Sequence, residues 1–165
     1  MKYILLSFII GLTFKASAQI NYKYQNNLSF SYSETIENYK MLDSLYANAK
    51  LVEIGKSDIG RPLHLFVVSA DADFSPESLH NKGKAILLVN NGIHPGEPCG
   101  IDASLKFAED LLSKEKKLLK NTVVCIIPFY NIGGGLNRSC CSRAMQNGPQ
   151  EYGFRGNAQN RDLNR

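Results

Sequence analysis

Residues 92–100, GIHPGEPCG, place a histidine and a glutamate three positions apart on a turn that also holds two prolines and three glycines. Imidazole nitrogen and carboxylate oxygen are both good zinc ligands, and this spacing lets His94 and Glu97 point at one cation. The prolines restrict the turn, and ligands that are already ordered lose less entropy when a metal binds. A His-x-x-Glu pair also occurs by chance, so the motif predicts a metal site that needs support from elsewhere in the chain.

A second candidate lies in the last eleven residues, RGNAQNRDLNR, where arginine and asparagine recur around the aliphatic Leu163. The planar fork of an arginine grips a carboxylate with two parallel hydrogen bonds, and asparagine adds a neutral N–H donor beside it. Residues 155–165 therefore predict an anion site, and the carboxylate of a substrate suits it.

The elements that must position these groups begin with a helix over residues 33–49, which Ser33 opens with a capping-box pattern. Two strand-like runs, 51–55 and 63–69, are separated by a turn containing glycine and proline and predict a hairpin. A polar loop is expected over residues 71–84.

Residues 85–89 form a continuous apolar run, which predicts a strand covered on both faces and leads directly to His94. Pro98 suits the first turn of a helix, and residues 122–127 form a second apolar strand. Strand, helix and strand in this order predict a right-handed crossover in an α/β protein: a mixed, largely buried sheet with helices on both faces. Functional groups of such sheets gather beyond the carboxyl ends of the strands, where His94 lies. From residue 131 onward we expect loop.

Residues 1–18 have the pattern of an export signal, with an apolar run at 4–14 and a small-residue cleavage site. An uncleaved anchor is the alternative, but a membrane span needs roughly 20 apolar residues and Lys15 interrupts this run. We therefore expect a mature chain that starts at Gln19 with a lead at 19–32, is exported to the periplasm or the extracellular space, and has no membrane span after cleavage.

The charge of the chain excludes a broad class of partners. Removing Lys2 and Lys15 with the signal takes the formal charge from +4 to +2, and the basic cluster at 114–120 is interleaved with Glu115 and two leucines. Such a cluster is typical of a solvated helix end, so no nucleic-acid partner is expected. The four cysteines lack a Cys-x-x-Cys spacing, and we expect one disulfide or none, with its partners unassigned.

His94-Pro-Gly-Glu97 followed by Asp162-Leu-Asn-Arg165 resembles the zinc carboxypeptidase family, the M14 metallopeptidases, over roughly residues 38–165. The resemblance implies that His94 and Glu97 are ligands of one Zn²⁺ per full-length catalytic domain. It also implies that Asn164 and Arg165 bind the terminal carboxylate of the substrate. Arg155 matches the arginine that stabilises the oxyanion in many bacterial members, although three other arginines, Arg138, Arg143 and Arg161, lie in the same loop region.

The chain also departs from the family pattern. Residues 131–134 are Asn-Ile-Gly-Gly where the family commonly has Asn-Pro-Asp-Gly, which indicates a divergent subgroup. The third zinc ligand, the general-base glutamate and a substrate-capping tyrosine of the family lie downstream of the Asn-Arg motif. His64 and His80 precede His94 and are interpreted as structural or solvated. Residues 33–165 thus resemble the N-terminal half of a catalytic domain, truncated after that half, which we expect to be inactive alone.

The resemblance implies a zinc-dependent metallocarboxypeptidase that hydrolyses C-terminal residues from peptides with a free terminal carboxylate. Two alternatives stay open. One is an amidohydrolase of the same superfamily that deacylates N-acyl amino acids, against which the export signal argues. The other is a zinc-free binding module that keeps the fold without catalysis. The sequence determines neither the residue cleaved nor the oligomeric state.

Overall fold

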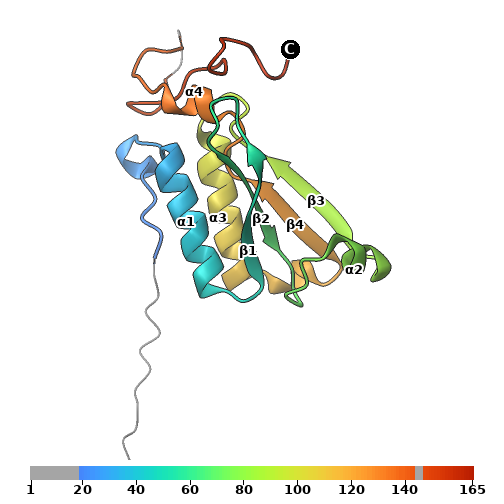
Figure 1. Cartoon of the computed structure of the whole chain (residues 1–165). Helices are drawn as coiled ribbons and strands as arrows, with labels where there is room; N and C mark the ends of the chain where they lie inside the picture. Colours follow the sequence, from blue (N-terminus) through green and yellow to red (C-terminus); the bar gives the residue numbers. More distant parts are fainter. Residues whose placement is uncertain (1–18, 144–146) are drawn as a thin grey trace, which may run out of the picture.

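The computed structural model of the chain describes residues 19–143 and 147–165, so the expected export signal lies outside the described residues. Its centre is a mixed four-stranded sheet in the order β1-β2-β4-β3 (Figure 1). Strand β2 is antiparallel to both of its neighbours, β1 and β4, whereas β3 and β4 are parallel. The strands are β1 (Ala49–Lys56), β2 (Pro62–Val68), β3 (Ala85–Asn90) and β4 (Thr122–Ile127). The expected hairpin, crossover and mixed α/β sheet are confirmed.

Two long helices, α1 (Tyr32–Leu45) and α3 (Cys99–Ser113), lie side by side against one face of the sheet (Figure 1). Apolar side chains at helical spacing form their inner faces, and burying them drives the packing. The fully buried Tyr39 and Leu105 belong to this core together with Phe66 and Ile126 of the sheet. The short α2 (Pro76–Asn81) covers part of the opposite face through a cluster of Leu79 with Val67 and Val123.

Three local expectations need correction. The capping box at the start of α1 is formed by Ser31 and Glu34 rather than by Ser33, because the Ser31 side chain accepts from the Glu34 N–H and Glu34 accepts from the Ser31 N–H. The expected polar loop at 71–84 contains α2, which Ser75 caps. The expected loop after residue 131 begins with α4 (Ile132–Leu136), where the Asn131 side chain accepts from the Gly134 N–H. Two 3₁₀ turns, Tyr24–Asn26 and Lys116–Leu119, complete the described helical segments.

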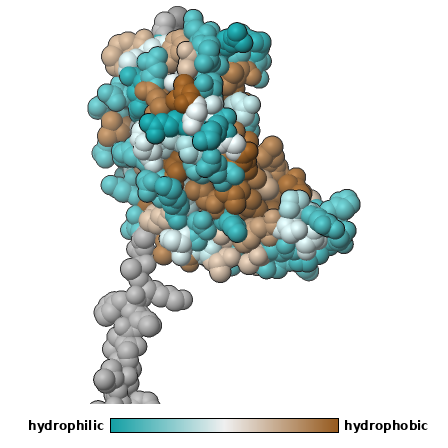
Figure 2. Space-filling model, viewed as in Figure 1, coloured by the Kyte–Doolittle hydropathy of each residue, from teal (hydrophilic) through white to brown (hydrophobic). Residues whose placement is uncertain are grey.

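The expectation that residues 85–89 are covered on both faces is wrong. Strand β3 lies at an edge of the sheet, and Ile86, Leu87 and Leu88 are 54%, 47% and 57% exposed. A hydrophobic area is visible on the flank of the molecule where β3 lies (Figure 2). An apolar run indicates what a strand could bury, but the neighbours of the strand decide what it does bury.

The segment from α4 to residue 165 lies across the end of the molecule where β3 and β4 finish (Figure 1). Within it, the adjacent Cys140 and Cys141 form a disulfide, whereas Cys99 and Cys125 are free, in agreement with the expectation of at most one disulfide. No helix within the described ranges is long and apolar enough to cross a membrane.

Candidate active site at the carboxyl ends of β3 and β4

The turn that carries His94 and Glu97 connects the end of β3 to the start of α3. Gly92 adopts a φ of +67°, a left-handed conformation that glycine takes without strain, and the chain then bends sharply. The Glu97 N–H donates to the His94 carbonyl at 2.8 Å, which closes a tight turn between the two side chains. Pro98 is the N-cap residue of α3, one position before the helical first turn in which the sequence placed it.

His94 is held between two carboxylates. Its Nε2 lies 2.9 Å from Oδ1 of Asp162, and its Nδ1 lies 3.9 Å from Oε1 of Glu97. The ring is largely buried, with 11% of the side chain exposed. A carboxylate on one ring nitrogen fixes the orientation of the imidazole and makes the other nitrogen a better metal ligand. Asp162 therefore directs Nδ1 of His94 toward Glu97.

This geometry fits a zinc ion. Zinc–nitrogen and zinc–oxygen bonds are each about 2.0–2.2 Å, so two ligands of one ion must lie within about 4 Å of each other. Nδ1 of His94 and Oε1 of Glu97 meet that condition. Among residues 19–143 and 147–165, no cluster of three or more histidine, cysteine or acidic side chains could hold a metal.

Two arginines from the C-terminal segment converge on Glu97. Arg143 donates a hydrogen bond to Oε1 of Glu97, and one terminal nitrogen of Arg155 lies 3.5 Å from the same oxygen. Arg155 also donates from Nε to Oδ2 of Asp162 at 2.8 Å. The structure thus places Arg155 beside the predicted ligand Glu97 and beside Asp162, and brings Arg143 to the same Glu97 oxygen.

Both carboxylates of the site are acidified by their partners. The pKa of Glu97 is lowered, first by the hydrogen bond from Arg143 and further by the charges of His94 and Arg155. The pKa of Asp162 is lowered well below its usual range, first by the Asn164 N–H and then by His94 and Arg155. Each carboxylate is therefore ionised at neutral pH, the state that a metal ligand and a histidine-orienting group require.

The predicted carboxylate clamp is only partly assembled. Asn164 helps to line a hollow of about 280 Å³ together with His94 and Glu97, and its N–H donates to Oδ1 of Asp162 at 3.0 Å. Arg165 is exposed, and within the part of the chain that the structure describes it makes no hydrogen bond or ion pair. The structure brings Asn164 to the predicted metal ligands but does not bring Arg165 there.

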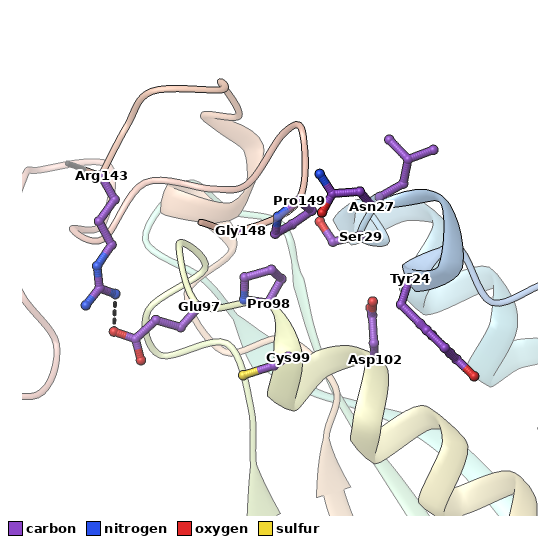
Figure 3. Close-up of a pocket in the computed structure, with 11 residues that line it drawn as sticks. Tyr24, Asn27, Ser29, Glu97, Pro98, Cys99, Asp102, Arg143, Gly148 and Pro149 are labelled. Atoms are coloured by element: carbon purple, nitrogen blue, oxygen red, sulfur yellow. Dashed lines mark hydrogen bonds and ion pairs between the residues drawn. The ribbon is translucent and has the colours of Figure 1, made fainter. Parts of the chain in front are cut away.

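A second hollow, of about 370 Å³, also borders Glu97 (Figure 3). Its walls include Tyr24 and Leu28 from the lead, Pro149 from the C-terminal segment, and Asp102 from α3. Glu97 and Cys99 line both hollows, so the two meet at the predicted metal ligand.

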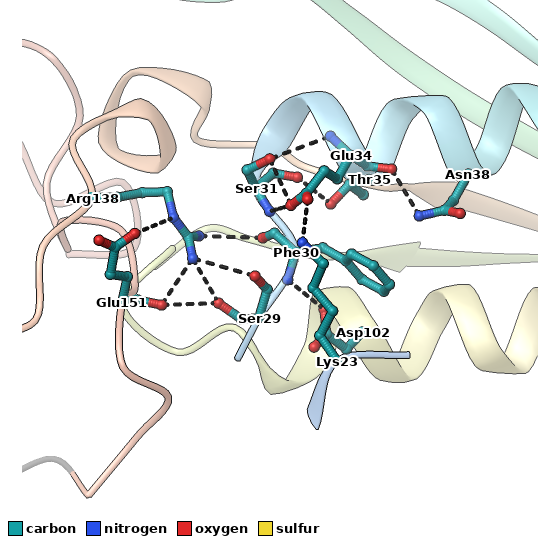
Figure 4. A network of polar contacts seen from close by, with 10 residues as sticks. All are labelled: Lys23, Ser29, Phe30, Ser31, Glu34, Thr35, Asn38, Asp102, Arg138 and Glu151. Atoms are coloured by element: carbon teal, nitrogen blue, oxygen red, sulfur yellow. Dashed lines mark hydrogen bonds and ion pairs between the residues drawn. The ribbon is translucent and has the colours of Figure 1, made fainter. Parts of the chain in front are cut away.

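A polar network holds the N-terminal lead, residues 19–32, against α3 and the segment that follows α4 (Figure 4). Arg138 donates to the carbonyls of Ser29 and Phe30, both at 3.3 Å, and to the carbonyl of Glu151 at 2.9 Å. Asp102 accepts from the Phe30 N–H at 3.4 Å. Arg138, one of the arginines considered for the oxyanion, therefore holds the lead instead of facing Glu97.

Sequence reasoning missed the role of Asn131, which is 1% exposed. Its side-chain nitrogen donates to the carbonyls of Ile93 at 3.1 Å and Arg155 at 3.2 Å, and its oxygen accepts from the Gly134 N–H. The Asn131 side chain thus links Ile93, the residue before His94, to Arg155, the residue predicted to stabilise the oxyanion. An asparagine four positions after a buried strand was the available signal, but its partners lie 38 and 24 residues away.

The other histidines lie apart from this cluster. His64 belongs to β2, and burial lowers its pKa; His80 is an exposed residue of α2. Neither contacts His94 or Glu97 among the described residues.

Comparison with known proteins identifies the family. The model of the zinc carboxypeptidase family matches residues 36–165, which is most of the chain. The chain belongs to the zinc carboxypeptidase family. None of the curated proteins matches it. Membership implies a zinc cofactor, which agrees with the geometry of His94 and Glu97.

Solved structures share the fold of this zinc carboxypeptidase chain. They include carboxypeptidase A from Helicoverpa armigera, with 23% identity, a TM-score of 0.59, and coverage of 67% of this chain and 26% of that chain. The metallo-carboxypeptidase from Burkholderia cenocepacia has 19% identity, a TM-score of 0.62, and coverage of 82% and 32%. That from Pseudomonas aeruginosa, solved with (2-guanidinoethylmercapto)succinic acid, has 18% identity, a TM-score of 0.56, and coverage of 82% and 31%. The chain spans about a third of these structures or less.

Proposed function

We propose that the protein is a zinc-dependent metallocarboxypeptidase that removes C-terminal residues from peptides. The observation that carries the proposal is the geometry of His94, whose Nε2 is held by Asp162 while Nδ1 faces Glu97 at 3.9 Å. Such an arrangement orients a histidine toward a metal. Zinc bound there would supply Lewis-acid polarisation of the scissile carbonyl and acidification of a bound water.

The residues of this chain have separate roles in the proposal. His94 and Glu97 hold the metal. Arg155, fixed by Asp162, directs its guanidinium to the oxyanion that develops on the scissile carbonyl. Asn164 and Arg165 bind the terminal carboxylate, which restricts cleavage to a chain end.

The third zinc ligand and the general base of the proposed enzyme are assigned to chain beyond residue 165. The partial coverage of the solved carboxypeptidases supports that assignment. Residues 19–165 alone should then be inactive, because water activation needs a base and a complete coordination sphere. Hydrolysis of a peptide by purified residues 19–165 would contradict this. We further propose that residues 1–18 direct export to the periplasm or beyond.

The deciding experiment measures zinc content and hydrolysis of a blocked dipeptide by the full-length protein and by its His94→Ala variant. His80→Ala, at an exposed histidine of α2, is the matched control. We expect about one zinc per chain and turnover in the wild type and control, with both lost in His94→Ala. Absence of zinc and turnover in the wild type would instead support a binding module that has lost catalysis.

A substrate comparison separates the proposal from the deacylase alternative. The full-length protein would be given a peptide with a free C-terminal carboxylate and, separately, an N-acyl amino acid. Faster release of the C-terminal residue from the peptide is expected, whereas a preference for the acylated amino acid would favour the amidohydrolase.

A further inference from the structure

The turn between β1 and β2 reaches the C-terminal segment through one carboxylate. Oδ2 of Asp58 accepts a hydrogen bond from the Ala158 N–H at 2.8 Å, across 100 positions of sequence. The hairpin turn is itself well braced, because the Ser57 N–H donates to the Arg61 carbonyl at 2.8 Å and the Gly60 N–H donates to the Ser57 carbonyl at 2.9 Å. Asp58 therefore projects from a fixed base.

Gly133 of α4 lies against the Asp58 carboxylate and leaves room for it. A Cβ at Gly133 would lie 2.8 and 2.9 Å from the two carboxylate oxygens of Asp58, closer than real Cβ atoms approach, and 2.9 Å from the Ala158 nitrogen. Asp58 thus occupies the space that a side chain at position 133 would fill. Hairpin, α4 and C-terminal segment meet at this point.

The segment that Asp58 holds is a compact turn. Oδ1 of Asn157 accepts from the Gln159 and Arg161 N–H groups at 3.0 and 2.9 Å, and the Asn157 N–H donates to the Arg161 carbonyl at 2.9 Å. Among the described residues, the contact from Ala158 to Asp58 is the one hydrogen bond that joins residues 157–161 to the rest of the molecule.

This turn separates the two groups that contact the predicted metal ligands. Arg155 precedes it and Asp162 follows it, and the turn brings them together at 2.8 Å. Asp162 orients His94, and Arg155 lies 3.5 Å from Glu97. A displacement of the turn would therefore move both groups relative to His94 and Glu97.

We propose that Asp58 is a positioning residue for the peptide hydrolysis proposed above, holding the 157–161 turn so that Arg155 and Asp162 stay aligned with His94 and Glu97. The inference rests on the proposed function and adds a residue that lies 36 positions before His94. Asp58 acts through the Ala158 backbone and does not touch the reacting atoms.

The test compares Asp58→Ala and Asp58→Asn in the full-length protein. Asparagine keeps an oxygen that accepts from the Ala158 N–H, whereas alanine does not. For Asp58→Ala we expect zinc content near the wild-type value and a kcat lowered about 10- to 100-fold with a smaller change in KM, because a misplacement of about 1 Å has effects of this size. Asp58→Asn should retain most of the wild-type kcat.

Hydrogen exchange of the Ala158 amide gives a measurement that does not depend on turnover. Exchange should accelerate in Asp58→Ala and stay slow in Asp58→Asn. Asp73→Ala is the control, because Asp73 also accepts hydrogen bonds from a local turn but lies beside α2. It should leave both the Ala158 exchange and kcat unchanged.

The outcomes separate this inference from the function on which it rests. An active wild type whose Asp58→Ala variant keeps slow Ala158 exchange and a kcat within twofold would overturn the role of Asp58 alone. A wild type with neither zinc nor turnover would overturn the proposed function, and the catalytic positioning role with it.

Discussion

Strands β3 and β4 are parallel neighbours with similar apolar sequences, AILLVN and TVVCII, yet their side chains differ in how far they are exposed to solvent. In β4, Val123, Val124 and Ile126 are at most 3% exposed, whereas three residues of β3 are about half exposed. The reason is topological, because β4 lies between β2 and β3 while β3 has a strand on one side only. Strand composition therefore indicates an apolar element without indicating its place in the sheet.

The two strands also differ in how their ends reach the site. Strand β4 continues to Asn131, a buried residue whose hydrogen bonds tie three backbone segments together. Strand β3 continues to His94 and Glu97, whose partners come from the distant Asp162, Arg143 and Arg155. The β4 end supplies a framework, and the β3 end supplies chemical groups that other segments must orient.

The largest effect should come from opening a cavity on the β4 side. Ile126 is fully buried in the core under α1 and α3, so Ile126→Ala should lower the free energy of unfolding by about 2–5 kcal/mol. Urea denaturation of the full-length protein measures the change. A cost below about 1 kcal/mol, typical of a site open to solvent, would contradict the central placement of β4.

The end of β4 should be nearly as sensitive. Asn131→Leu keeps a similar volume but leaves the Gly134 N–H and the Ile93 and Arg155 carbonyls without their partner. Leaving buried polar groups unpaired should cost about 3 kcal/mol of unfolding free energy, and turnover should fall further because Arg155 loses its tether. Asn137→Leu, at the C-cap of α4, is the control. An Asn131→Leu variant with the stability and kcat of this control would show that Asn131 does not organise the site.

The sequence predicted the elements whose signal is local. The apolar stripes of α1 and α3, the hairpin and the β4 strand all follow from periodicity within short windows, and the structure confirms them. The exposure of β3 could not be predicted this way, because it depends on which strands pair. The helices α2 and α4 were missed because a polar or glycine-rich composition predicts loop, while capping by Ser75 and Asn131 makes a short helix instead.

The candidate site likewise contains residues that have a local sequence signal and residues that have none. His94, Glu97 and Arg155 were named from the sequence, and the structure places His94 and Arg155 within 4 Å of the same Glu97 oxygen. Asp162 was quoted only as part of a motif, because its contact with His94 spans 68 positions. No local pattern predicts such a pairing, so orienting residues become visible only once the chain is folded.

On the β3 side, Asp102 of α3 should give a smaller, pH-dependent effect. Desolvation raises its pKa to about 6, with Lys23, Glu34 and Arg138 as the charged groups nearby. An acid with a raised folded pKa favours the folded state at low pH, and this contribution is lost as pH rises from about 4 to about 6. Asp102→Asn still accepts from the Phe30 N–H, so it should be more stable than the wild type by about 1–2 kcal/mol at pH 8, after allowance for solvent screening.

Unfolding free energies between pH 4 and pH 8 test this, and Asp73→Asn provides a control that should keep a constant offset from the wild type over that range. The pKa of Asp73 is lowered to about 2, first by its hydrogen bond from Lys82, so its contribution is lost only as pH falls from about 4 to about 2. Parallel stability profiles for the wild type and Asp102→Asn from pH 4 to pH 8 would show that the Asp102 carboxylate is not desolvated.

The smallest effect should come from the apolar residues of β3 itself. Leu88 is 57% exposed, so Leu88→Ala removes few buried contacts and should lower the free energy of unfolding by less than about 1 kcal/mol. Measuring Leu88→Ala and Ile126→Ala under the same conditions compares the two strands through the ratio of the unfolding free energy lost at Ile126 to that lost at Leu88. Nearly equal costs would show that a partner, or chain outside the described residues, covers β3 in the full-length protein. A ratio well above two would show that β3 keeps an open edge in solution.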